Sequence, residues 1–281
     1  MTGRADAAGT WTLGDLTVNR LGFGAMRLVG DRDQSIAVLR RAVELGVNHI
    51  DTAAFYFSPM HSANELINSA LAPYDGVVIA TKVGPGRDPW GNWIDQVRPD
   101  QLRGQVEENL RQLGRDHLDV VNFRRRSEPN VADYIGALAE LRDLGLIRHI
   151  GISNVGPEAV AVALEVTPIV EVQNAFAVDS QSEHQRDLVR LCAEQQIAYV
   201  PFFSIVGHDD GDRRTADDVV AAIAADRDAS PAQIRLAWTL QLSPNVLAIP
   251  GTGNPAHLDE NVAAAAIRLT EDELTRLDRL E

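Results

Sequence analysis

The sequence has 281 residues and a formal net charge of −14 at pH 7. An acidic surface repels nucleic acids and anionic membranes, so we expect no nucleic-acid and no membrane partner. No stretch approaches the ~20 consecutive apolar residues that span a bilayer, and residues 1–20 lack the apolar segment of a secretion signal, which predicts a cytoplasmic protein. The single cysteine, Cys192, cannot form an internal disulfide, and we expect it to be a buried apolar residue.

The first expected element is a β-hairpin. TWTLGDLTVNR (10–20) alternates apolar and polar residues around Gly14-Asp15, a pair typical of hairpin turns. Eight apolar, β-rich segments then recur at 21–25, 48–52, 77–82, 119–123, 148–153, 169–173, 197–202 and 245–249. Helical periodicity lies between them, as in 99–114, where Gly114 supplies a stop, and in 130–145, where Asn130 can cap and Gly145 ends the helix.

Eight strands that alternate with helices predict an α/β protein in which parallel strands close into a (β/α)8 TIM barrel. The hairpin is expected at the bottom of the barrel, and residues 1–281 are expected to form a single domain because no Pro-, Gly- or Ser-rich linker divides them. An open doubly wound sheet is the main alternative. It is disfavoured because no GxGxxG pattern follows the first strand.

In such a barrel, functional side chains gather where the strands end. Asp51 and Lys82 both close apolar strands, where an unpaired charge would be costly, so we expect them to pair. Tyr56 follows Asp51 on a loop over the same rim. A tyrosine is a poor acid at neutral pH, but a nearby lysine favours the phenolate, so Tyr56 could donate a proton to a carbonyl oxygen.

NHIDTAAFY, VVIATKVG, HIGISNV, VEVQN and IPGTGNPAHLDEN resemble successive motifs of the aldo-keto reductases, from about Leu13 to the C-terminal helix. The chain looks most similar to the bacterial pyridoxal reductase (pyridoxine 4-dehydrogenase) branch of that family. The resemblance implies a (β/α)8 barrel that reduces aldehydes or ketones with NADPH, NADH being the alternative cofactor, and a small aromatic aldehyde such as pyridoxal as substrate. It further implies that Tyr56 is the acid, tuned by Asp51 and Lys82.

The family resemblance also raises a question about Arg124. Most relatives carry a histidine at the end of the fourth strand, where LDVVNFR places Arg124. Strand alternation puts Arg124 at the barrel mouth and Arg125 on the other side. An arginine cannot shuttle a proton, but it can donate hydrogen bonds to a substrate oxygen and stabilise a developing alkoxide. The alternative is a cofactor-binding regulatory subunit with weak turnover.

The cofactor site that the resemblance implies is spread over several strand ends. Asn254 can cap a helix that starts at Pro255, which offers backbone N–H groups to a phosphate. Ser153, Asn154 and Gln173 are expected at the nicotinamide carboxamide, and Phe202 on its ring. The full expected set is Gly24, Met26, Ser153, Asn154, Gln173, Phe202, Ser204, Gly251, Thr252, His257, Glu260 and Asn261, with Val206 beside Ser204.

Substrate and assembly expectations complete the prediction. Arg27, Phe55, Trp90 and Trp93 could wall a substrate pocket. We expect a small-molecule carbonyl substrate and a monomer or weak homo-oligomer. The seven histidines do not cluster at strand ends, so no metal site is expected, and His49 is interpreted as a hydrogen-bonded core histidine.

Overall fold

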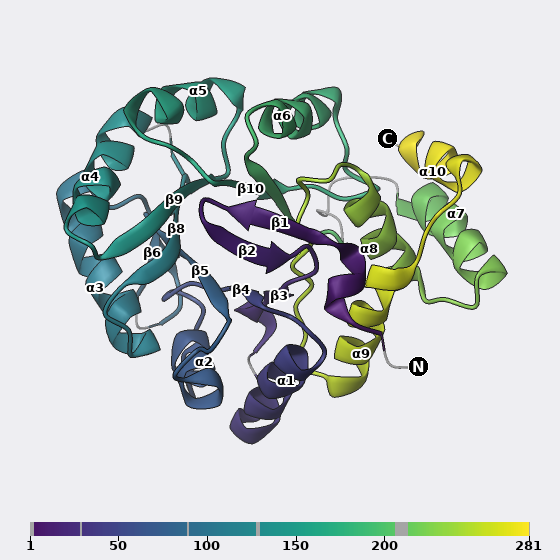
Figure 1. Cartoon of the computed structure of the whole chain (residues 1–281), viewed down its shortest axis with the longest axis horizontal. Helices are drawn as coiled ribbons and strands as arrows, with labels where there is room; N and C mark the ends of the chain where they lie inside the picture. Colours follow the sequence, from purple (N-terminus) through teal and green to yellow (C-terminus); the bar gives the residue numbers. More distant parts are fainter. Residues whose placement is uncertain (1–2, 29, 89, 128–129, 206–212, 281) are drawn as a thin grey trace.

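A computed structural model of the chain describes residues 3–28, 30–88, 90–127, 130–205 and 213–280, without the side chains of 213–215. Seven parallel strands form one curved sheet, and helices surround it (Figure 1). In spatial order the strands are β11 (Ala198–Phe202), β10 (Glu171–Ala175), β9 (Ile147–Ser153), β8 (Leu118–Arg124), β5 (Val78–Val83), β4 (His49–Asp51) and β3 (Phe23–Gly24). All seven correspond to predicted strands.

The helices also agree with the sequence pattern. They are α1 (Arg32–Glu44), α2 (Ala63–Leu71), α3 (Leu102–Leu113), α4 (Val131–Asp143), α5 (Pro157–Val166), α6 (Glu183–Glu194), α7 (Arg213–Asp226), α8 (Pro231–Gln241), α9 (Pro255–Ala263) and α10 (Glu271–Asp278). Gly114 and Gly145, at φ 63° and 80°, end α3 and α4 in left-handed conformations that favour glycine. Asn130 occupies the N-cap of α4, but its side chain makes no capping hydrogen bond.

The predicted eighth strand, 245–249, closes the barrel with single β-bridges instead of a regular strand. Val246 bridges Tyr199 of β11, and Ala248 bridges Leu21 just before β3. The Tyr199 N–H donates to the Asn245 carbonyl, and the Gly22 N–H donates to the Ala248 carbonyl. Further along, Pro201 and Pro250 lack the N–H groups that would continue the two ladders. The ring of eight strands is therefore complete but weakly bonded here.

Two glycines allow this closure at the carboxyl end of the barrel. A Cβ on Gly24 would lie 2.6 Å from the Ile249 carbonyl oxygen, and a Cβ on Gly251 would lie 2.4 Å from the Gly24 carbonyl oxygen. Both contacts are with backbone, which cannot rotate away. The end of β3 and the segment before α9 thus approach as closely as only glycine permits.

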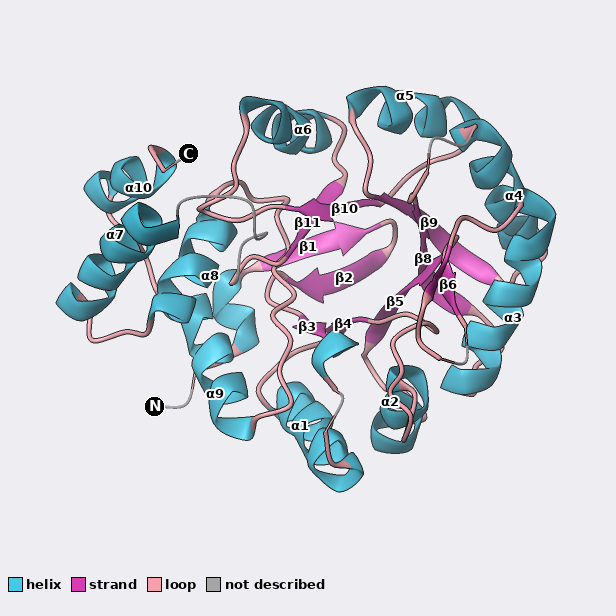
Figure 2. Cartoon of the chain, turned by 180° about the vertical axis from the view of Figure 1, so that it is seen from behind, coloured by secondary structure: helices cyan, strands magenta, loops and turns pink. Residues whose placement is uncertain are grey.

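The N-terminal hairpin covers the bottom of the barrel as predicted. β1 (Thr10–Leu13) and β2 (Leu16–Asn19) pair in antiparallel fashion and lie across the opening (Figure 1). Asp15 in its turn accepts hydrogen bonds from Arg148 and His149 near the start of β9. Figure 2 shows the barrel from the opposite side, with the hairpin behind the ring of strands. The hairpin does not cover the opposite end of the barrel, where the carboxyl ends of the parallel strands lie.

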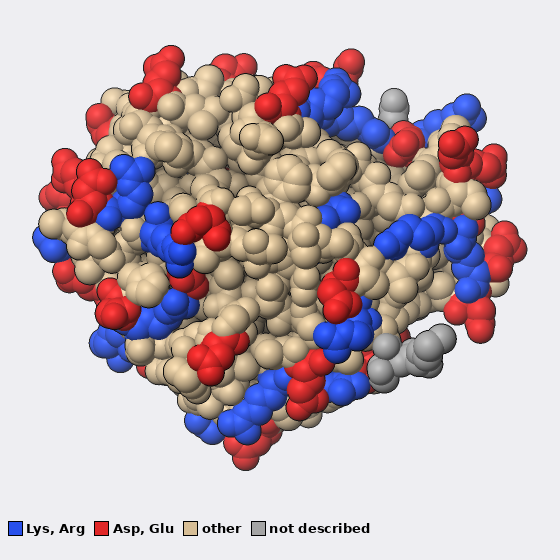
Figure 3. Space-filling view, viewed as in Figure 1, with Lys and Arg blue, Asp and Glu red and all other residues tan. Residues whose placement is uncertain are grey.

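The core has two parts. Inside the barrel, Leu13 and Val18 of the hairpin pack on inward side chains of the strands, among them Val78, Val120 and Leu247. A larger cluster fills the space between the strands and the outer helices. On the hairpin face, acidic and basic side chains are interspersed around the rim, with mostly uncharged surface between them (Figure 3). No helix of the described residues is both long and apolar enough to cross a membrane.

We predict that Leu13→Ala destabilises the protein, because Leu13 is fully buried in the barrel interior. Truncating a buried leucine costs about 2–5 kcal/mol in the free energy of unfolding. Urea unfolding followed by circular dichroism measures the loss. Leu16→Ala, on the same hairpin but only partly buried, is the control and should lose less. Equal losses would show that the hairpin does not plug the barrel in solution.

Candidate active site

A buried ion pair lies at the carboxyl end of the barrel. The Lys82 Nζ lies 2.6 Å and 2.7 Å from the two carboxylate oxygens of Asp51 and also donates to the Thr52 carbonyl at 3.0 Å. Lys82 is 1% exposed and Asp51 is 3% exposed. Burial lowers the pKa of Lys82, but the charge of Asp51 and its hydrogen bond outweigh burial and leave that pKa above its usual value. The predicted pair therefore exists and holds a charged ammonium inside the barrel.

Tyr56 lies directly above this pair. Its backbone N–H donates to the Ala53 carbonyl, which turns the chain over the end of β4. The Lys82 Nζ lies 5.0 Å from the centre of the Tyr56 ring, and the Phe55 ring packs edge-on against it at 5.3 Å. The phenol is thus held between a cation and an aromatic ring.

Arg124 reaches the same place from β8, as alternation predicted. Phe123 points outward and stacks on Tyr134 of α4, whereas Arg124 points into the barrel mouth. Its guanidinium carbon lies 5.2 Å from the centre of the Phe202 ring. Its buried Nε has no hydrogen-bond partner within the described part of the chain. This cation is therefore available for a ligand.

These side chains line a cavity of about 680 Å³, within the range of small-molecule sites. Its wall comes from the ends of β3, β4, β8 and β11, from the β6 (Gly86–Arg87) and β7 (Trp93–Ile94) hairpin, and from the segment before α9. The lining residues are Gly24, Met26, Arg27, Asp51, Tyr56, Arg87, Trp93, Arg124, Phe202, Phe203, Ser204, Ile205, Ile249, Pro250, Gly251, Thr252, Gly253 and His257. The lining residues thus extend from the barrel mouth to the start of α9.

Polar side chains continue below the ion pair into the barrel. The Asn122 Nδ2 donates to the Glu171 Oε1 at 2.5 Å, and both residues are fully buried. Burial raises the pKa of Glu171 to about 7, and the charge of Asp51 adds to this, while Asn122 and Lys82 oppose it. His49 is also buried, and burial lowers its pKa to about 4. Neither ring nitrogen of His49 has a partner among the described residues, so the expected hydrogen bonds of a core histidine are not made.

Of the three side chains expected at a nicotinamide carboxamide, Ser153 and Gln173 are buried, whereas Asn154 is exposed. The Gln173 Nε2 donates to the Asp51 carboxylate at 2.8 Å, which leaves its Oε1 without a partner within the described ranges. The Ser153 hydroxyl is likewise buried and unpartnered there. Asn154, at φ 63°, instead donates its side-chain amide to the Arg125 carbonyl. Unsatisfied buried polar atoms are costly, so Ser153 and Gln173 suit a polar ligand.

A capped turn precedes α9 at the edge of the cavity. Asn254 caps α9 by accepting from the Ala256 N–H, and Pro255 is the first helical residue, as predicted. The Thr252 hydroxyl accepts from the Asn254 N–H at 3.0 Å. Thr252 and His257 line the cavity, so the amino end of α9 is directed to it. Backbone N–H groups and the helix dipole favour a phosphate at such a position.

Comparison with known proteins agrees with this geometry. Residues 20–281 match the model of the aldo/keto reductase family. The chain belongs to the aldo/keto reductase family. It is therefore an NAD(P)H-dependent oxidoreductase, and carbonyl reduction is its chemistry.

Two curated relatives of this aldo/keto reductase extend over nearly all of it. It is 43% identical to pyridoxine 4-dehydrogenase of Escherichia coli, over 97% of this chain and 98% of that protein. It is 37% identical to an uncharacterized oxidoreductase of Schizosaccharomyces pombe, over 98% and 90%. Among solved structures, an aldo-keto reductase from Klebsiella pneumoniae in complex with NADPH has a TM-score of 0.82 at 27% identity, covering 100% of this chain and 95% of that chain. These relatives do not favour the regulatory-subunit alternative.

The cavity brings together most of the site residues predicted for this aldo/keto reductase. Lys82 reaches it through Asp51, and Phe55 through Tyr56. Asn261 is buried in α9, whereas Glu260 is exposed and neither lines the cavity. Trp90 does not line the cavity and is 84% exposed, and its backbone N–H donates to the Asp88 carboxylate. Val206 lies outside the described residues.

Sequence reasoning missed several lining residues, of which Arg87 is the most informative. Arg87 lies in β6 directly opposite Trp93 in β7, and its guanidinium carbon is 4.5 Å from the centre of the Trp93 ring. The sequence signal was GPGRDPWGNW, in which the turn residues between Arg87 and Trp93 are typical of a hairpin. Phe203, Ile205, Ile249 and Pro250 were also missed, and they flank residues that were predicted.

We predict that Glu171 makes stability depend on pH. Its folded pKa of about 7 lies above the ordinary carboxyl value of 4.5, so its stabilising contribution is complete below about pH 4.5 and is lost as pH rises through 7. Glu171→Gln keeps a neutral group and the shape of the side chain. Relative to wild type, this variant should gain about 1–3 kcal/mol in the free energy of unfolding between pH 4.5 and 8.

Urea unfolding at several pH values measures this difference. Glu165→Gln, which removes an exposed carboxylate of α5, is the matched control. Its free energy of unfolding relative to wild type should not change with pH. A difference for Glu171→Gln that does not change with pH would mean that the buried carboxyl keeps an ordinary affinity for protons.

Proposed function

We propose that this chain reduces a small aromatic aldehyde to the alcohol with NADPH, with Tyr56 as the proton donor. The observation that carries the proposal is the buried Lys82–Asp51 pair beneath Tyr56, in a cavity that Arg124 also enters. NADPH, when bound, supplies the hydride that the carbonyl carbon accepts. The chain's own residues must then bind the carbonyl oxygen and deliver a proton to it.

Each residue has a physical role in that step. The Lys82 ammonium, kept charged by Asp51, lies 5.0 Å from the Tyr56 ring and stabilises negative charge that develops on the phenol as its proton leaves. Arg124 places a fixed positive charge where an alkoxide develops and donates hydrogen bonds to the oxygen. Because an arginine side chain has donors only and no acceptor, Arg124 orients the carbonyl without exchanging a proton. Tyr56 then donates the proton that completes the alcohol.

The residues present fit the cofactor. Gln173 contacts Asp51 of the cavity wall, and both Gln173 and Ser153 keep buried polar atoms without partners in the described part of the chain, which suits the carboxamide. Phe202 lies in the cavity wall and can pack on the nicotinamide ring. The turn from Gly251 to Asn254 and the amino end of α9 suit its phosphates. A relative from Klebsiella pneumoniae crystallised with NADPH supports this choice over NADH. Pyridoxal is proposed as a substrate because pyridoxine 4-dehydrogenase of Escherichia coli is 43% identical.

We predict that Tyr56→Phe lowers kcat for aldehyde reduction by about 10²–10⁴-fold, the usual contribution of a positioned general acid. NADPH and NADH consumption with pyridoxal and a panel of aromatic and aliphatic aldehydes measures this. Tyr134→Phe is the matched control: its hydroxyl binds the Val97 carbonyl, away from the cavity, and turnover should persist. Unchanged kcat in Tyr56→Phe would assign the proton to another group.

We predict that Arg124→Gln lowers kcat by about 10²-fold, because removing one charged donor to a developing oxyanion costs about that much. Steady-state kinetics with a neutral aldehyde measure it. Cofactor binding, followed by quenching of tryptophan fluorescence, should remain, since Arg124 is placed at the carbonyl. An unaltered kcat would contradict the role of Arg124 and leave that of Tyr56 untouched.

A further inference from the structure

Cationic side chains are concentrated at the cavity of an acidic protein. Arg27, Arg87 and Arg124 line it, and the one carboxylate among the lining residues, Asp51, is already bound to Lys82. The whole chain carries a net charge of −14. Within the described part of the chain, the buried Nε atoms of both Arg87 and Arg124 lack hydrogen-bond partners. The cavity therefore has an excess of unneutralised positive charge.

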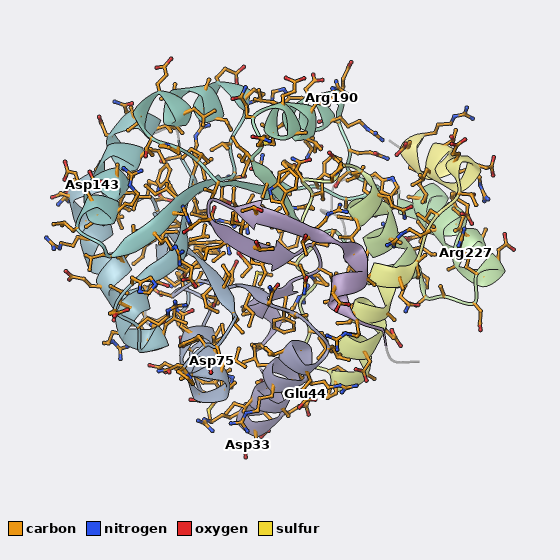
Figure 4. The ribbon with its side chains drawn as sticks, viewed as in Figure 1. Asp33, Glu44, Asp75, Asp143, Arg190 and Arg227 are labelled. Atoms are coloured by element: carbon orange, nitrogen blue, oxygen red, sulfur yellow. The ribbon has the colours of Figure 1, made fainter. Side chains whose placement is uncertain are left out.

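Several arginines elsewhere on the molecule are neutralised by carboxylates. Arg190 on α6 pairs with Asp187, and Arg227, after α7, pairs with Glu273 at 2.5 Å. Both lie at the periphery, among other charged side chains of the outer helices and their connections (Figure 4). Arg235, a buried residue of α8, forms ion pairs with both Asp179 and Asp217. Three like charges in one cavity without such partners repel one another, and a bound anion would relieve that repulsion.

The fold directs Arg87 into the cavity. β6 and β7 pair in antiparallel register, so Arg87 stands opposite Trp93 and stacks on it. Its sequence neighbour Asp88 cannot neutralise it, because that carboxylate accepts hydrogen bonds from the backbone N–H groups of Trp90 and Asn92 and from the Asn92 side chain. Stacking fixes the guanidinium plane before any ligand arrives, so less entropy is lost on binding.

The position of Arg87 separates it from the cofactor phosphates. The phosphate turn lies before α9, at the closing segment 245–250, and Arg27 lies near it, since a Cβ on Gly253 would be 3.3 Å from the Arg27 carbonyl oxygen. The hairpin that carries Arg87 follows β5, and β3 and β4 lie between β5 and the closing segment. Arg87 instead shares its part of the wall with Tyr56, Trp93 and Arg124, where the reacting carbonyl is expected.

We infer that Arg87 binds an anionic group of the substrate, so the preferred substrates are aromatic aldehydes that carry a carboxylate or a phosphate. This inference rests on the proposed function. In the complex, Arg124 contacts the carbonyl oxygen and Arg87 forms a paired, charge-assisted contact with the anion. Trp93, whose ring packs edge-on against Phe55 at 5.5 Å, gives the aromatic ring of the substrate an apolar wall.

Matched pairs of aldehydes test this directly. 4-Carboxybenzaldehyde against benzaldehyde, and pyridoxal 5′-phosphate against pyridoxal, each differ by one anionic group. For wild type with NADPH we expect kcat/KM to be about tenfold or more higher for at least one anionic member, mainly through KM, and the advantage to shrink with added salt. The pair with the larger ratio identifies the anion as carboxylate or phosphate.

Variants of Arg87 locate the effect. Arg87→Gln should lower the anionic-to-neutral ratio of kcat/KM by about tenfold or more, and Arg87→Lys, which keeps the charge without the planar fork, should keep part of it. The matched control is Arg126→Gln. Arg126 also stacks on Trp93 at 4.5 Å, but it is exposed and does not line the cavity, so its ratio should equal that of wild type. Thermal melting confirms that each variant is folded.

The outcomes are distinct. Wild type that prefers the neutral member of both pairs, or equal changes in ratio for Arg87→Gln and Arg126→Gln, overturns the inference and leaves the proposed reductase intact. Equal changes would mean that both arginines only support Trp93. If wild type consumes NADPH with none of the aldehydes, neutral or anionic, the proposed function itself fails.

Discussion

The Lys82 ammonium and the Asp51 carboxylate are each nearly removed from solvent, where neither would persist alone. Their contact at 2.6 Å offsets the cost of burying both charges and ties the end of β5 to the end of β4. Gln173 donates to the same carboxylate from β10, across the barrel. The pair thus fixes the relative positions of three strand ends, and Tyr56 is placed over it by the turn that follows Asp51. Removing either partner would leave the other as an unpaired buried charge and would also displace the Tyr56 phenol.

The barrel interior holds the charged Lys82–Asp51 pair at its carboxyl end, and the rest of the interior is apolar or adds little net charge. The hairpin fills the bottom with Leu13 and Val18. Higher up, Glu171 is kept partly protonated and His49 is kept neutral by burial, so the polar interior adds little net charge beneath the pair. The closing segment 245–250 approaches β3 through Gly24 and Gly251, which brings the phosphate turn of α9 to the rim of the same cavity. The packing of the barrel and the placement of its charges therefore both shape the cavity at its carboxyl end.

Replacement of the usual histidine by Arg124 changes how such a site can work. A histidine can either donate or accept a proton, whereas an arginine supplies a permanent charge and several donors in a fixed plane. In the proposed reaction, Tyr56 delivers the proton and the Arg124 guanidinium binds the carbonyl oxygen. In the proposed complex, Arg87 binds the anionic group of the substrate. Asp51 in the cavity wall and Asp88 beside Arg87 do not neutralise the cavity arginines, because Asp51 pairs with Lys82 and Asp88 accepts hydrogen bonds within its own turn.

Several features followed from sequence because they depend on local pattern. Seven strands, the ends of α3 and α4, the hairpin and the capped start of α9 each arise from periodicity or from single glycine, proline and asparagine residues. The alternation of side chains along one strand was enough to predict that Arg124 points inward. The cost of burying an unpaired charge was enough to predict that Asp51 pairs with Lys82.

Other features depend on contacts between segments that are distant in the chain. The eighth strand became two bridges because Pro201 and Pro250 remove donors from ladders with strands on either side. His49 lacks the expected hydrogen bonds, Trp90 is exposed to solvent, and Arg87 faces the cavity. Sequence patterns do not predict these outcomes, because each depends on which residues of other segments the fold brings close.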